Sequence, residues 1–503
     1  MSSDPFAVPS NGSLPAPEYR ETVVHLASEY WPYARTGGLA EAVRGIARYQ
    51  AAAGADTLVF MPLYQTTRLG FPDLEPCCEP FQVRVGLRDE TARVWHHPQA
   101  PQNPRIFFIE HEGYFGREGL YGTGGSDHAD NHIRFAFFCR AALDFLPKVS
   151  PGPTIIHAHD WHTALAPVSL RTALAGHAYY DQVASVLTVH NAGYQGHYGP
   201  EVLQDLGLDP GLFHHEIMEW YGKTNLLKGG LVFSDLVTTV SPTHARELRT
   251  RAGGFGLHDT FAALQDRFVG ILNGIDYEVW DPESDPWIEA QFSAGDLSGK
   301  DRCKASLQQA VGLQVLPDIP LFGMTARLAE QKGFDILLGT DMITRLKAQW
   351  IFLGEGEKRY EDALRALTEA HPEKVAAFFE FNEEREHKLL AGADLLLMPS
   401  QYEPCGLTQM RSQRYGALPV VRRVGGLVDT VEDRVTGFLF DEYQSWALEE
   451  AAQYAIDLYH DTEGWKDHVR DAMARDFSWS AGVGRYQDVY LRAAERRRAQ
   501  SSG

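Results

Sequence analysis

Two cations and a carboxylate stand at turns of the chain where phosphate and sugar chemistry could take place. Arg327 and Lys332 lie five residues apart, between a strand-like apolar run and a helix-like one. Cations beside a helix N-terminus can clamp a diphosphate and neutralise the charge of a departing nucleotide without a metal ion. Glu403 occupies a similar turn, where an acceptor-only carboxylate suits the hydroxyls of a sugar or ribose. A solvated basic pair and a loop glutamate in water are the alternatives at this point.

A third turn combines glycines with a cation. Arg35 precedes Gly37 and Gly38, and Glu41 follows in the helix that the glycines open. Glycines let the backbone approach a ligand closely, and the fork-shaped guanidinium of Arg35 suits phosphate. The segment is not G-x-G-x-x-G, so a dinucleotide-binding fold is not indicated. Further glycine turns after strands in both halves of the chain favour one phosphate-bearing ligand as the common explanation.

Histidine and aspartate cluster after two further strand-like runs. Residues 157–162 read HAHDWH, and residues 188–196 read TVHNAGYQG. The metallohydrolase pattern H-x-H-x-D-H fails because Asp160 comes one residue early, and neighbouring side chains point in different directions, so no metal site is predicted. We interpret Asp160 as a positioned carboxylate beside Trp161, whose ring could stack on a sugar face; a core histidine cluster is the alternative. His190 could donate to a sugar hydroxyl, could place its neighbouring carbonyl near developing positive charge, or could be structural.

A mainly parallel sheet would bring these turns together. Short apolar strands are expected at 22–27, 57–61, 105–109, 154–157, 185–190, 236–240, 321–325, 349–353, 376–379, 395–398 and 419–421. Their alternation with helical patterns predicts an α/β fold, and a helix is predicted over 409–415. The carboxyl ends of parallel strands share one edge of a sheet, where open α/β sheets bind ligands.

A change of composition divides the chain. The stretch from Asn273 to about residue 304 is rich in Pro and Asp and is typical of an interdomain connection. We predict a loose tail over 1–20, a Rossmann-like N-terminal domain over 21–285 and a second Rossmann-like domain over 286–475. A helical segment over 476–503 ends the chain. Two such domains facing one another would form a central cleft, which is a common place for a ligand.

Composition narrows the classes of function. The 503 residues include 46 basic and 67 acidic ones, and a net charge of −21 argues against nucleic-acid or anionic-membrane partners. The five cysteines are scattered and odd in number, which indicates neither a disulfide framework nor a zinc site and fits a reducing cytoplasm. No apolar stretch approaches the ~18 residues of a membrane span, and the first twenty residues lack the apolar core of a signal peptide.

Taken in order, these segments resemble the bacterial glycogen synthases and plant starch synthases of glycosyltransferase family 5. The matching stretches are RTGGLAE, DNHIRFAFFCRAAL, HAHDWHTAL, TVHNAGYQG, VTTVSPTHARE, ILNGIDYEVWDP, ARLAEQKG, GADLLLMPSQYEPCGLTQM, VGGLVDTVED and FSWS, over about residues 21–490. The resemblance implies a GT-B fold, with two Rossmann-like domains around a cleft and a final helix that crosses back to the first. It also implies transfer of glucose from a nucleotide-glucose, ADP-glucose in bacterial members, to the non-reducing end of an α-1,4-glucan. Anomeric configuration would be retained, and no cofactor or metal would be needed.

The resemblance assigns roles to individual residues. The predicted catalytic residues are Glu403, Asp160, His190, Arg327 and Lys332. The predicted substrate-binding residues are Arg35, Gly37, Gly38, Glu41, Trp161, Asn191, Asn273, Phe381, Cys405, Gly406, Leu407 and Thr408. In this scheme the two C-terminal cations and Arg35 hold the diphosphate, Phe381 stacks on the base, and the last four residues give backbone contacts to the donor.

The chain departs from the family pattern at several of these positions. Arg35 stands where the family has Lys, Glu41 where it has Asp, and Phe381 where it has Tyr. Arg411 occupies a position that is usually aromatic or His, and Ala192 with the glycine after it replaces a larger apolar–small pair. These departures concern the donor base, the sugar and the acceptor, so UDP-glucose is a further possible donor.

The mechanism implied is attack by the acceptor 4-hydroxyl on the face that the nucleotide leaves, with the departing phosphate taking the proton. No second carboxylate with glycosidase spacing is then required. Three other functions compete with this one: a related retaining GT-B transferase with another donor or a small-sugar acceptor, a non-catalytic glucan-binding homologue, and a metallohydrolase.

Overall fold

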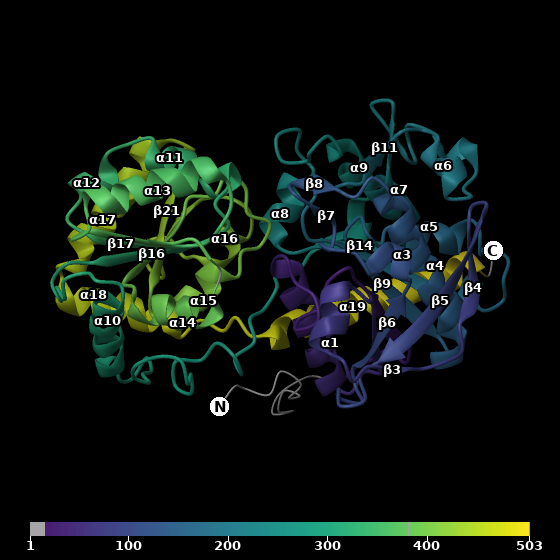
Figure 1. The fold of residues 1–503 in the computed structure, drawn as a ribbon, viewed down its shortest axis with the longest axis horizontal. Helices are drawn as coiled ribbons and strands as arrows, with labels where there is room; N and C mark the ends of the chain where they lie inside the picture. The colour runs from purple at the N-terminus through teal and green to yellow at the C-terminus, as the bar shows by residue number, and fades with distance from the viewer. Residues whose placement is uncertain (1–15, 381, 502–503) are drawn as a thin grey trace. The chain divides into compact units, whose positions relative to one another are not determined.

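The computed structural model describes residues 16–380 and 382–501, and these form two units (Figure 1). The N-terminal unit runs to Gly274 and takes up the chain again from Trp479. The C-terminal unit is Ile275–Ser478. Each unit is built on a mainly or wholly parallel sheet covered by helices, so the α/β class predicted from the alternation of strands and helices is confirmed.

The N-terminal unit is built on a large sheet with the order β15-β14-β10-β9-β1-β2-β6-β5-β3, and β4 pairs with β5. Its strands are β1 (Thr22–Leu26), β2 (Thr57–Pro62), β3 (Glu75–Pro76), β4 (Phe81–Val85), β5 (Arg88–His96), β6 (Arg105–Glu110), β9 (Thr154–His159), β10 (Ala184–Val189), β14 (Leu236–Thr239) and β15 (Phe268–Gly270). Pairing is parallel from β15 to β6 and antiparallel among β6, β5, β4 and β3. Small antiparallel pairings join β7 (Gly122–Thr123) to β8 (Ser126–Asp127), and β13 (Lys223–Asn225) to β11 (His197–Tyr198) and β12 (Glu219–Trp220).

Helices surround this sheet on both faces. They are α1 (Gly38–Ala52), α2 (Gln65–Gly70), α3 (Glu112–Phe115), α4 (Asn131–Val149), α5 (Leu165–Arg171), α6 (Val202–Asp205), α7 (Leu226–Phe233), α8 (Pro242–Glu247), α9 (His258–Ala263) and α19 (Trp479–Ser501), with 3₁₀ turns at Tyr180–Gln182, Pro210–Leu212 and Gln265–Arg267. Every residue of β2, β9 and β10 is buried, as expected of parallel strands that are covered on both faces.

Helix α19 returns from the end of the chain to pack beside α1 and β10 (Figure 1). The approach is close because position 45 is glycine: a Cβ on Gly45 would lie 2.0 Å from Nε1 of Trp479. Tyr490 of the same helix is buried against the sheet. The last helix is therefore part of the N-terminal core, although nearly the whole C-terminal unit precedes it in sequence.

The C-terminal unit is built on a six-stranded parallel sheet with the order β18-β17-β16-β19-β20-β21. Its strands are β16 (Leu321–Thr325), β17 (Gln349–Leu353), β18 (Val375–Phe378), β19 (Leu395–Met398), β20 (Leu418–Arg422) and β21 (Phe438–Phe440). Its helices are α10 (Ser298–Ala310), α11 (Phe334–Leu338), α12 (Met342–Arg345), α13 (Lys358–Ala370), α14 (Glu383–Gly392), α15 (Thr408–Arg414), α16 (Gly425–Thr430), α17 (Ser445–Tyr459) and α18 (Thr462–Met473), with a 3₁₀ turn at Glu330–Lys332. The central strands are buried throughout.

The first boundary between the units lies earlier than the predicted residue 285. The N-terminal unit ends at Gly274. Tyr415 donates its O–H to Asp285 Oδ2 at 2.6 Å, and Trp280 stacks on His387 with ring centroids 3.8 Å apart. The stretch predicted as a connection therefore belongs to the core of the C-terminal unit.

The other two boundaries also differ from the prediction. The chain leaves the C-terminal unit after Ser478 rather than at residue 475, because Phe477 N–H donates to the Tyr277 hydroxyl at 2.7 Å. Residues 1–15 of the predicted tail lie outside the described residues. Tyr19, near the end of that tail, is buried edge-on against Tyr490 with ring centroids 5.3 Å apart, so it is part of the N-terminal unit.

The strands predicted from apolar runs are all present, with ends shifted by up to two residues. The antiparallel β4–β5 ribbon was not predicted, because its residues alternate between buried and exposed and carry many charges. None of the described helices has the length and apolar character needed to cross a membrane.

Candidate active site

In the C-terminal unit, a lysine and a glutamate meet at the carboxyl edge of the sheet. Glu403 lies in the loop from β19 to α15, and Lys332 ends the 3₁₀ turn that follows β16. Lys332 Nζ donates to Glu403 Oε2 at 2.6 Å, and Ser400 Oγ donates to the same oxygen at 3.0 Å. Oε1 makes no hydrogen bond with the described residues, so it is available to a hydroxyl group. The structure thus brings together two residues that the sequence places 71 positions apart.

Close backbone contacts hold the loop that carries Glu403. Gly426 N–H donates to the Glu403 carbonyl at 3.0 Å, and a Cβ at position 426 would lie 2.2 Å from the Cys405 carbonyl oxygen. Gly406 has a φ of 72°, and Gln409 Nε2 donates to its carbonyl oxygen at 3.0 Å. Leu407 and Thr408 open α15 without a side-chain cap, so backbone N–H groups there stay available. These contacts fix the path of the loop that carries the carboxylate.

Arg327 lies five residues before Lys332 but, unlike Lys332, has no carboxylate partner in the part of the chain that the structure describes. Its side chain is exposed and has no hydrogen bond or ion pair among the described residues. The glycine turn opposite its loop has a packing role, because a Cβ on Gly354 would lie 1.9 Å from the Ala326 carbonyl oxygen. Leu328 N–H donates to the Glu355 carbonyl at 2.9 Å. That glycine therefore allows two loops to meet and is not itself evidence of a phosphate site.

Two of the family departures fall in this unit. Phe381, the predicted base-stacking residue, lies outside the described residues. Arg411 is buried, with its guanidinium 4.1 Å from the centroid of the Trp280 ring and 3.4 Å from a Glu386 carboxylate oxygen. Arg411 thus serves the interior packing of the unit.

In the N-terminal unit, the glycine turn after β1 is anchored by a buried carboxylate. Glu29 accepts hydrogen bonds from the backbone N–H and the hydroxyl of Thr36, both at 2.6 Å, and from the Tyr121 hydroxyl at 2.6 Å. The exposed Gly37 is the N-cap of α1 and has no side-chain capping bond. The turn therefore presents free N–H groups at the positive end of a 15-residue helix.

Arg35 and Glu41, two predicted substrate contacts on this turn, bind each other. Arg35 Nη1 lies 2.9 Å from Glu41 Oε1, and both side chains are partly exposed. The family departures at these positions are thus coupled, since the longer carboxylate reaches the longer cation. A phosphate that approached Arg35 would compete with Glu41 for the same guanidinium.

Asp160 holds the ends of two strands together. It follows β9 with a φ of 57°, and its Oδ1 accepts from His190 N–H at 2.6 Å and from Asn191 N–H at 3.3 Å. Burial raises the pKa of Asp160 to about 7, and the two backbone donors oppose that shift. Asn191 in turn accepts from Gly193 N–H at 2.9 Å. The predicted catalytic aspartate therefore fixes the turn that carries His190.

The predicted stacking role of Trp161 is wrong. Trp161 as a whole is only 7% exposed, and its indole packs edge-on against Phe135 with ring centroids 5.5 Å apart. A Cβ on Gly196 would lie 2.5 Å from the indole, so the following loop closes over it. The ring is a core side chain and has no face open to a sugar. Asn273 is also buried, at 7% exposure.

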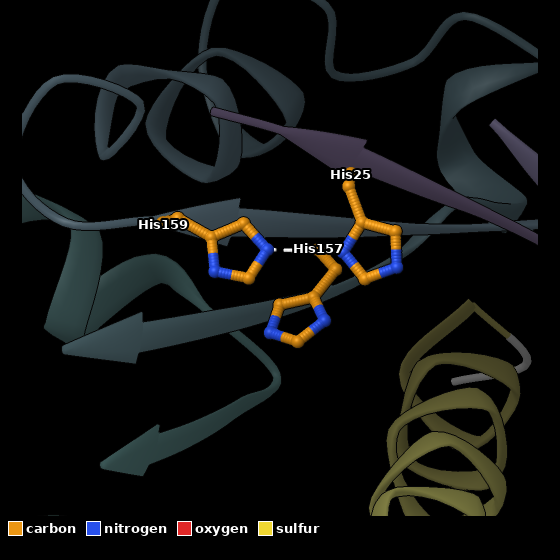
Figure 2. A group of neighbouring side chains, drawn as sticks. All are labelled: His25, His157 and His159. Carbon is orange, nitrogen blue, oxygen red and sulfur yellow. Dashed lines mark hydrogen bonds between the residues drawn. The ribbon is translucent and has the colours of Figure 1, made fainter. Parts of the chain in front are cut away.

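The core-histidine alternative applies to His157 and His159. Both point to one face of β9, two residues apart, and His25 of the neighbouring β1 meets them there (Figure 2). The three rings offer ligand nitrogens within 4.8 Å of one another, but every ring nitrogen already has a hydrogen-bond partner. A metal ion would have to displace those bonds. His190 joins the group through a 2.9 Å contact between its Nε2 and His159 Nδ1.

Three members of this group were missed in the sequence: His25, Gln50 and Tyr490. They belong to β1, α1 and α19, and His25 and Gln50 lie 2.9 Å apart while Gln50 and Tyr490 lie 2.8 Å apart. The one available signal was a histidine within an otherwise apolar buried strand.

Comparison with known proteins identifies the family. Residues 22–263 match the family described as starch synthase catalytic domain, and residues 314–471 match glycosyl transferases group 1. A glycogen synthase of Anaeromyxobacter dehalogenans is 42% identical over 93% of this chain and 98% of its own. The chain belongs to the glycogen synthase family. Another member of this family, from Geotalea daltonii, is 38% identical over 93% of this chain and 98% of its own.

Solved structures of related glycosyltransferases confirm the fold. The catalytic domain of starch synthase IV from Arabidopsis thaliana, bound to ADP and acarbose, superposes with a TM-score of 0.87 at 32% identity, covering 94% of this chain and 99% of that one. A sucrose-phosphate synthase from Thermosynechococcus elongatus shares the fold alone, with a TM-score of 0.58 at 16% identity, over 94% and 98% of the two chains. As a member of the glycogen synthase family, this chain is a glycosyltransferase with the two-domain GT-B fold.

Proposed function

We propose that this enzyme transfers glucose from ADP-glucose to the non-reducing end of an α-1,4-glucan, with retention of anomeric configuration and without a metal ion. The observation that carries the proposal is the Lys332–Glu403 pair, 2.6 Å apart at the edge of the C-terminal sheet. It sets a cation for a leaving phosphate beside a carboxylate with one free oxygen for a sugar hydroxyl. The names of the relatives support the glucan, and the ADP in the starch synthase IV structure supports the nucleotide.

The reaction requires that the bond from C1 of glucose to the diphosphate breaks while a bond to the acceptor O4 forms on the same face. The acceptor's proton goes to the departing phosphate oxygen. Lys332 and Arg327 stabilise the negative charge that grows on the nucleotide, and Glu403 orients the glucose through its hydroxyls.

The N-terminal unit contributes groups of a different kind. The uncapped start of α1 at Gly37 offers N–H groups to an anion, and the His190 carbonyl is an acceptor for positive charge that develops on the sugar ring. Asp160 fixes that carbonyl through its bonds to the backbone of the same turn. The base of the donor rests on the comparison with relatives alone, since the predicted stacking residue Phe381 is outside the described residues.

A donor and acceptor screen tests the proposal. Release of nucleoside diphosphate is measured with ADP-, UDP- and GDP-glucose, each with glycogen, maltose or glucose 1-phosphate, in the presence and absence of EDTA. We expect the fastest turnover with ADP-glucose and glycogen, unaffected by EDTA. Faster transfer to glucose 1-phosphate would identify a small-acceptor transferase, and binding to glycogen without turnover would identify a glucan-binding homologue. Loss of activity in EDTA would disprove the metal-free scheme.

A further inference from the structure

A continuous line of hydrogen bonds runs from His190 into the interior of the N-terminal unit. His190 Nε2 lies 2.9 Å from His159 Nδ1, and His159 Nε2 lies 3.0 Å from His25 Nδ1. His25 Nε2 lies 2.9 Å from Gln50 Oε1. Figure 2 shows the central step, with the His159 and His25 rings directed at one another across neighbouring strands. His159 and His25 each form hydrogen bonds through both ring nitrogens, whereas His190, at the end of the line, uses only Nε2 toward the described residues.

The line continues beyond Gln50 to the last helix of the chain. Gln50 Nε2 donates to the Tyr490 hydroxyl at 2.8 Å, and that hydroxyl lies 2.8 Å from His157 Nδ1. His157 Nε2 lies 2.6 Å from Thr188 Oγ1, which lies 2.6 Å from Thr238 Oγ1. All of these side chains are buried, so no solvent competes for the bonds along the way.

The amide of Gln50 gives the line a direction. Its Oε1 only accepts hydrogen bonds, so His25 Nε2 must carry a hydrogen. A neutral His25 then has a bare Nδ1, which accepts from His159 Nε2–H. The same reasoning leaves His159 Nδ1 bare, so it accepts from His190 Nε2–H.

Neutrality of the rings, on which this reasoning depends, follows from burial. Burial lowers the pKa of His25 to about 4 and that of His190 to about 3, and it lowers the pKa of His159 well below its ordinary value. Each ring therefore has one hydrogen and one lone pair at neutral pH.

We propose that His159, His25, Gln50 and Tyr490 are positioning residues that hold His190 in its Nε2–H tautomer, so that its Nδ1 accepts a hydrogen bond from a sugar hydroxyl. Nδ1 of His190 makes no hydrogen bond with any described residue and is the one ring nitrogen of the line left for a ligand. The inference rests on the proposed function. It reverses one of the alternatives that the sequence left open, in which the His190 side chain donates to a sugar hydroxyl.

The line has a second arrangement, in which the Gln50 amide is turned over and every bond reverses. His190 would then carry its hydrogen on Nδ1 and would donate to the ligand. Gln50 is thus the element whose orientation decides between donor and acceptor at His190, through two intervening rings. In the orientation that the structure has, the Tyr490 hydroxyl accepts from the Gln50 amide and is left to donate to His157 Nδ1.

Direct observation of the tautomers tests the inference without any assay. In the full chain labelled with ¹⁵N-histidine, two-bond ¹H–¹⁵N spectra distinguish a bare ring nitrogen from a protonated one, and the His190 signals are those lost in His190→Gln. We expect a bare Nδ1 and a protonated Nε2. A protonated Nδ1 in His190 would overturn the proposal, and so would a doubly protonated ring at neutral pH.

The remote end of the line supplies a matched pair of variants. Tyr490→Phe removes the hydroxyl that orients Gln50, and we expect the His190 signals to move toward a mixture of tautomers. Tyr19 packs on Tyr490, and its hydroxyl makes no hydrogen bond with the described residues. Tyr19→Phe should therefore leave the His190 signals unchanged. Identical spectra for the two variants would contradict a coupling through Gln50.

A third comparison connects the line to turnover. His159→Asn retains an oxygen near the place of Nδ1. His159→Leu, whose side chain has the same shape as asparagine, has no acceptor for His190 Nε2–H. We expect kcat on the order of 10-fold lower in the leucine variant than in the asparagine variant, with the KM for ADP-glucose within about 2-fold. Equal kcat values would overturn the role, since a purely structural contact would alter stability alone. Failure of every donor in the wild type would refute the proposed function, while the spectra would still decide the tautomer.

Discussion

The polar cluster of the C-terminal unit is charged and partly exposed, whereas that of the N-terminal unit is neutral and mostly buried. Lys332 and Glu403 form a charged pair at a sheet edge, where the lysine is still 21% exposed. His159 and His25 lie in a dry interior with the half-buried His190 at its edge, and burial lowers the pKa of each ring. A partly hydrated pair can stabilise charge that appears during a reaction, whereas a buried neutral line can only fix which atoms donate and which accept.

Removing the cation tests the charged side of this comparison and should have the largest effect. Lys332→Ala should lower kcat by roughly 10²–10³-fold, because the lost contact is stronger in the transition state and because Glu403 is left without its partner. Steady-state release of nucleoside diphosphate measures the change. Lys358→Ala, in an exposed ion pair with Asp362, is the control and should retain full activity. A change of only a few-fold for Lys332→Ala would mean that the pair does not act on the leaving group.

The carboxylate of the same pair should matter less. Glu403→Gln keeps the shape but loses the charge, and we expect kcat/KM for the donor to fall by about 10–100-fold, the range of a hydrogen bond to a charged group. Initial rates at varied donor concentration give the value. The control is Glu384→Gln, whose carboxylate is exposed and pairs with Lys388. A change confined to the KM for glucan would place Glu403 on the acceptor instead.

A third prediction concerns how tightly the last helix, which carries Tyr490, packs in the buried cluster of the N-terminal unit. Gly45→Ala would put a methyl group 2.0 Å from the Trp479 indole, and we expect a loss of about 1–3 kcal/mol in the free energy of unfolding. Denaturant titration measures it. Gly484→Ala, on α19 where nothing lies within 4 Å, should be neutral or stabilise by up to about 1 kcal/mol. Equal stability of the two variants would mean that α19 adjusts its position freely.

The last prediction is a pH dependence of stability that comes from Asp160. Its pKa rises from 3.8 in the unfolded chain to about 7 in the folded one, so its contribution is full below pH 4 and is lost as the pH rises toward 7. Between those values the free energy of unfolding should fall by at most about 1.4 kcal/mol per pH unit relative to Asp160→Asn, which still accepts from His190 N–H. Denaturation of both proteins at about pH 4.5, 6 and 8, which spans most of this window, measures the difference in their free energies of unfolding. Parallel profiles would show that the backbone donors keep Asp160 ionised throughout.

Local signals predicted much of the fold and part of the site. Apolar runs with glycine or proline after them identified the strands, because a strand covered on both faces must be apolar along its length. The same signals placed Lys332 and Glu403 after neighbouring strands β16 and β19, whose carboxyl ends share one edge of a parallel sheet. Their meeting at 2.6 Å is therefore a consequence of strand order.

Other features have no local signal. Trp161 has the composition of a sugar-stacking residue and is nevertheless enclosed by Phe135 and Gly196. The boundary predicted at residue 285 fell on a polar stretch whose Trp280 and Asp285 are buried. In each case burial depends on partners that are distant in sequence, and composition alone does not reveal them.

The sequence by itself determined the two α/β units, their strands and the turns that carry a cation, a carboxylate and glycines, because these depend on residues within a few positions of one another. Only the tertiary structure decided that His25, Gln50 and Tyr490 complete a line that ends at His190. Gln50 and Tyr490 are 440 positions apart and meet because α19 packs beside α1. Hydrogen-bond direction passes between groups in contact, so it is a property of the folded interior.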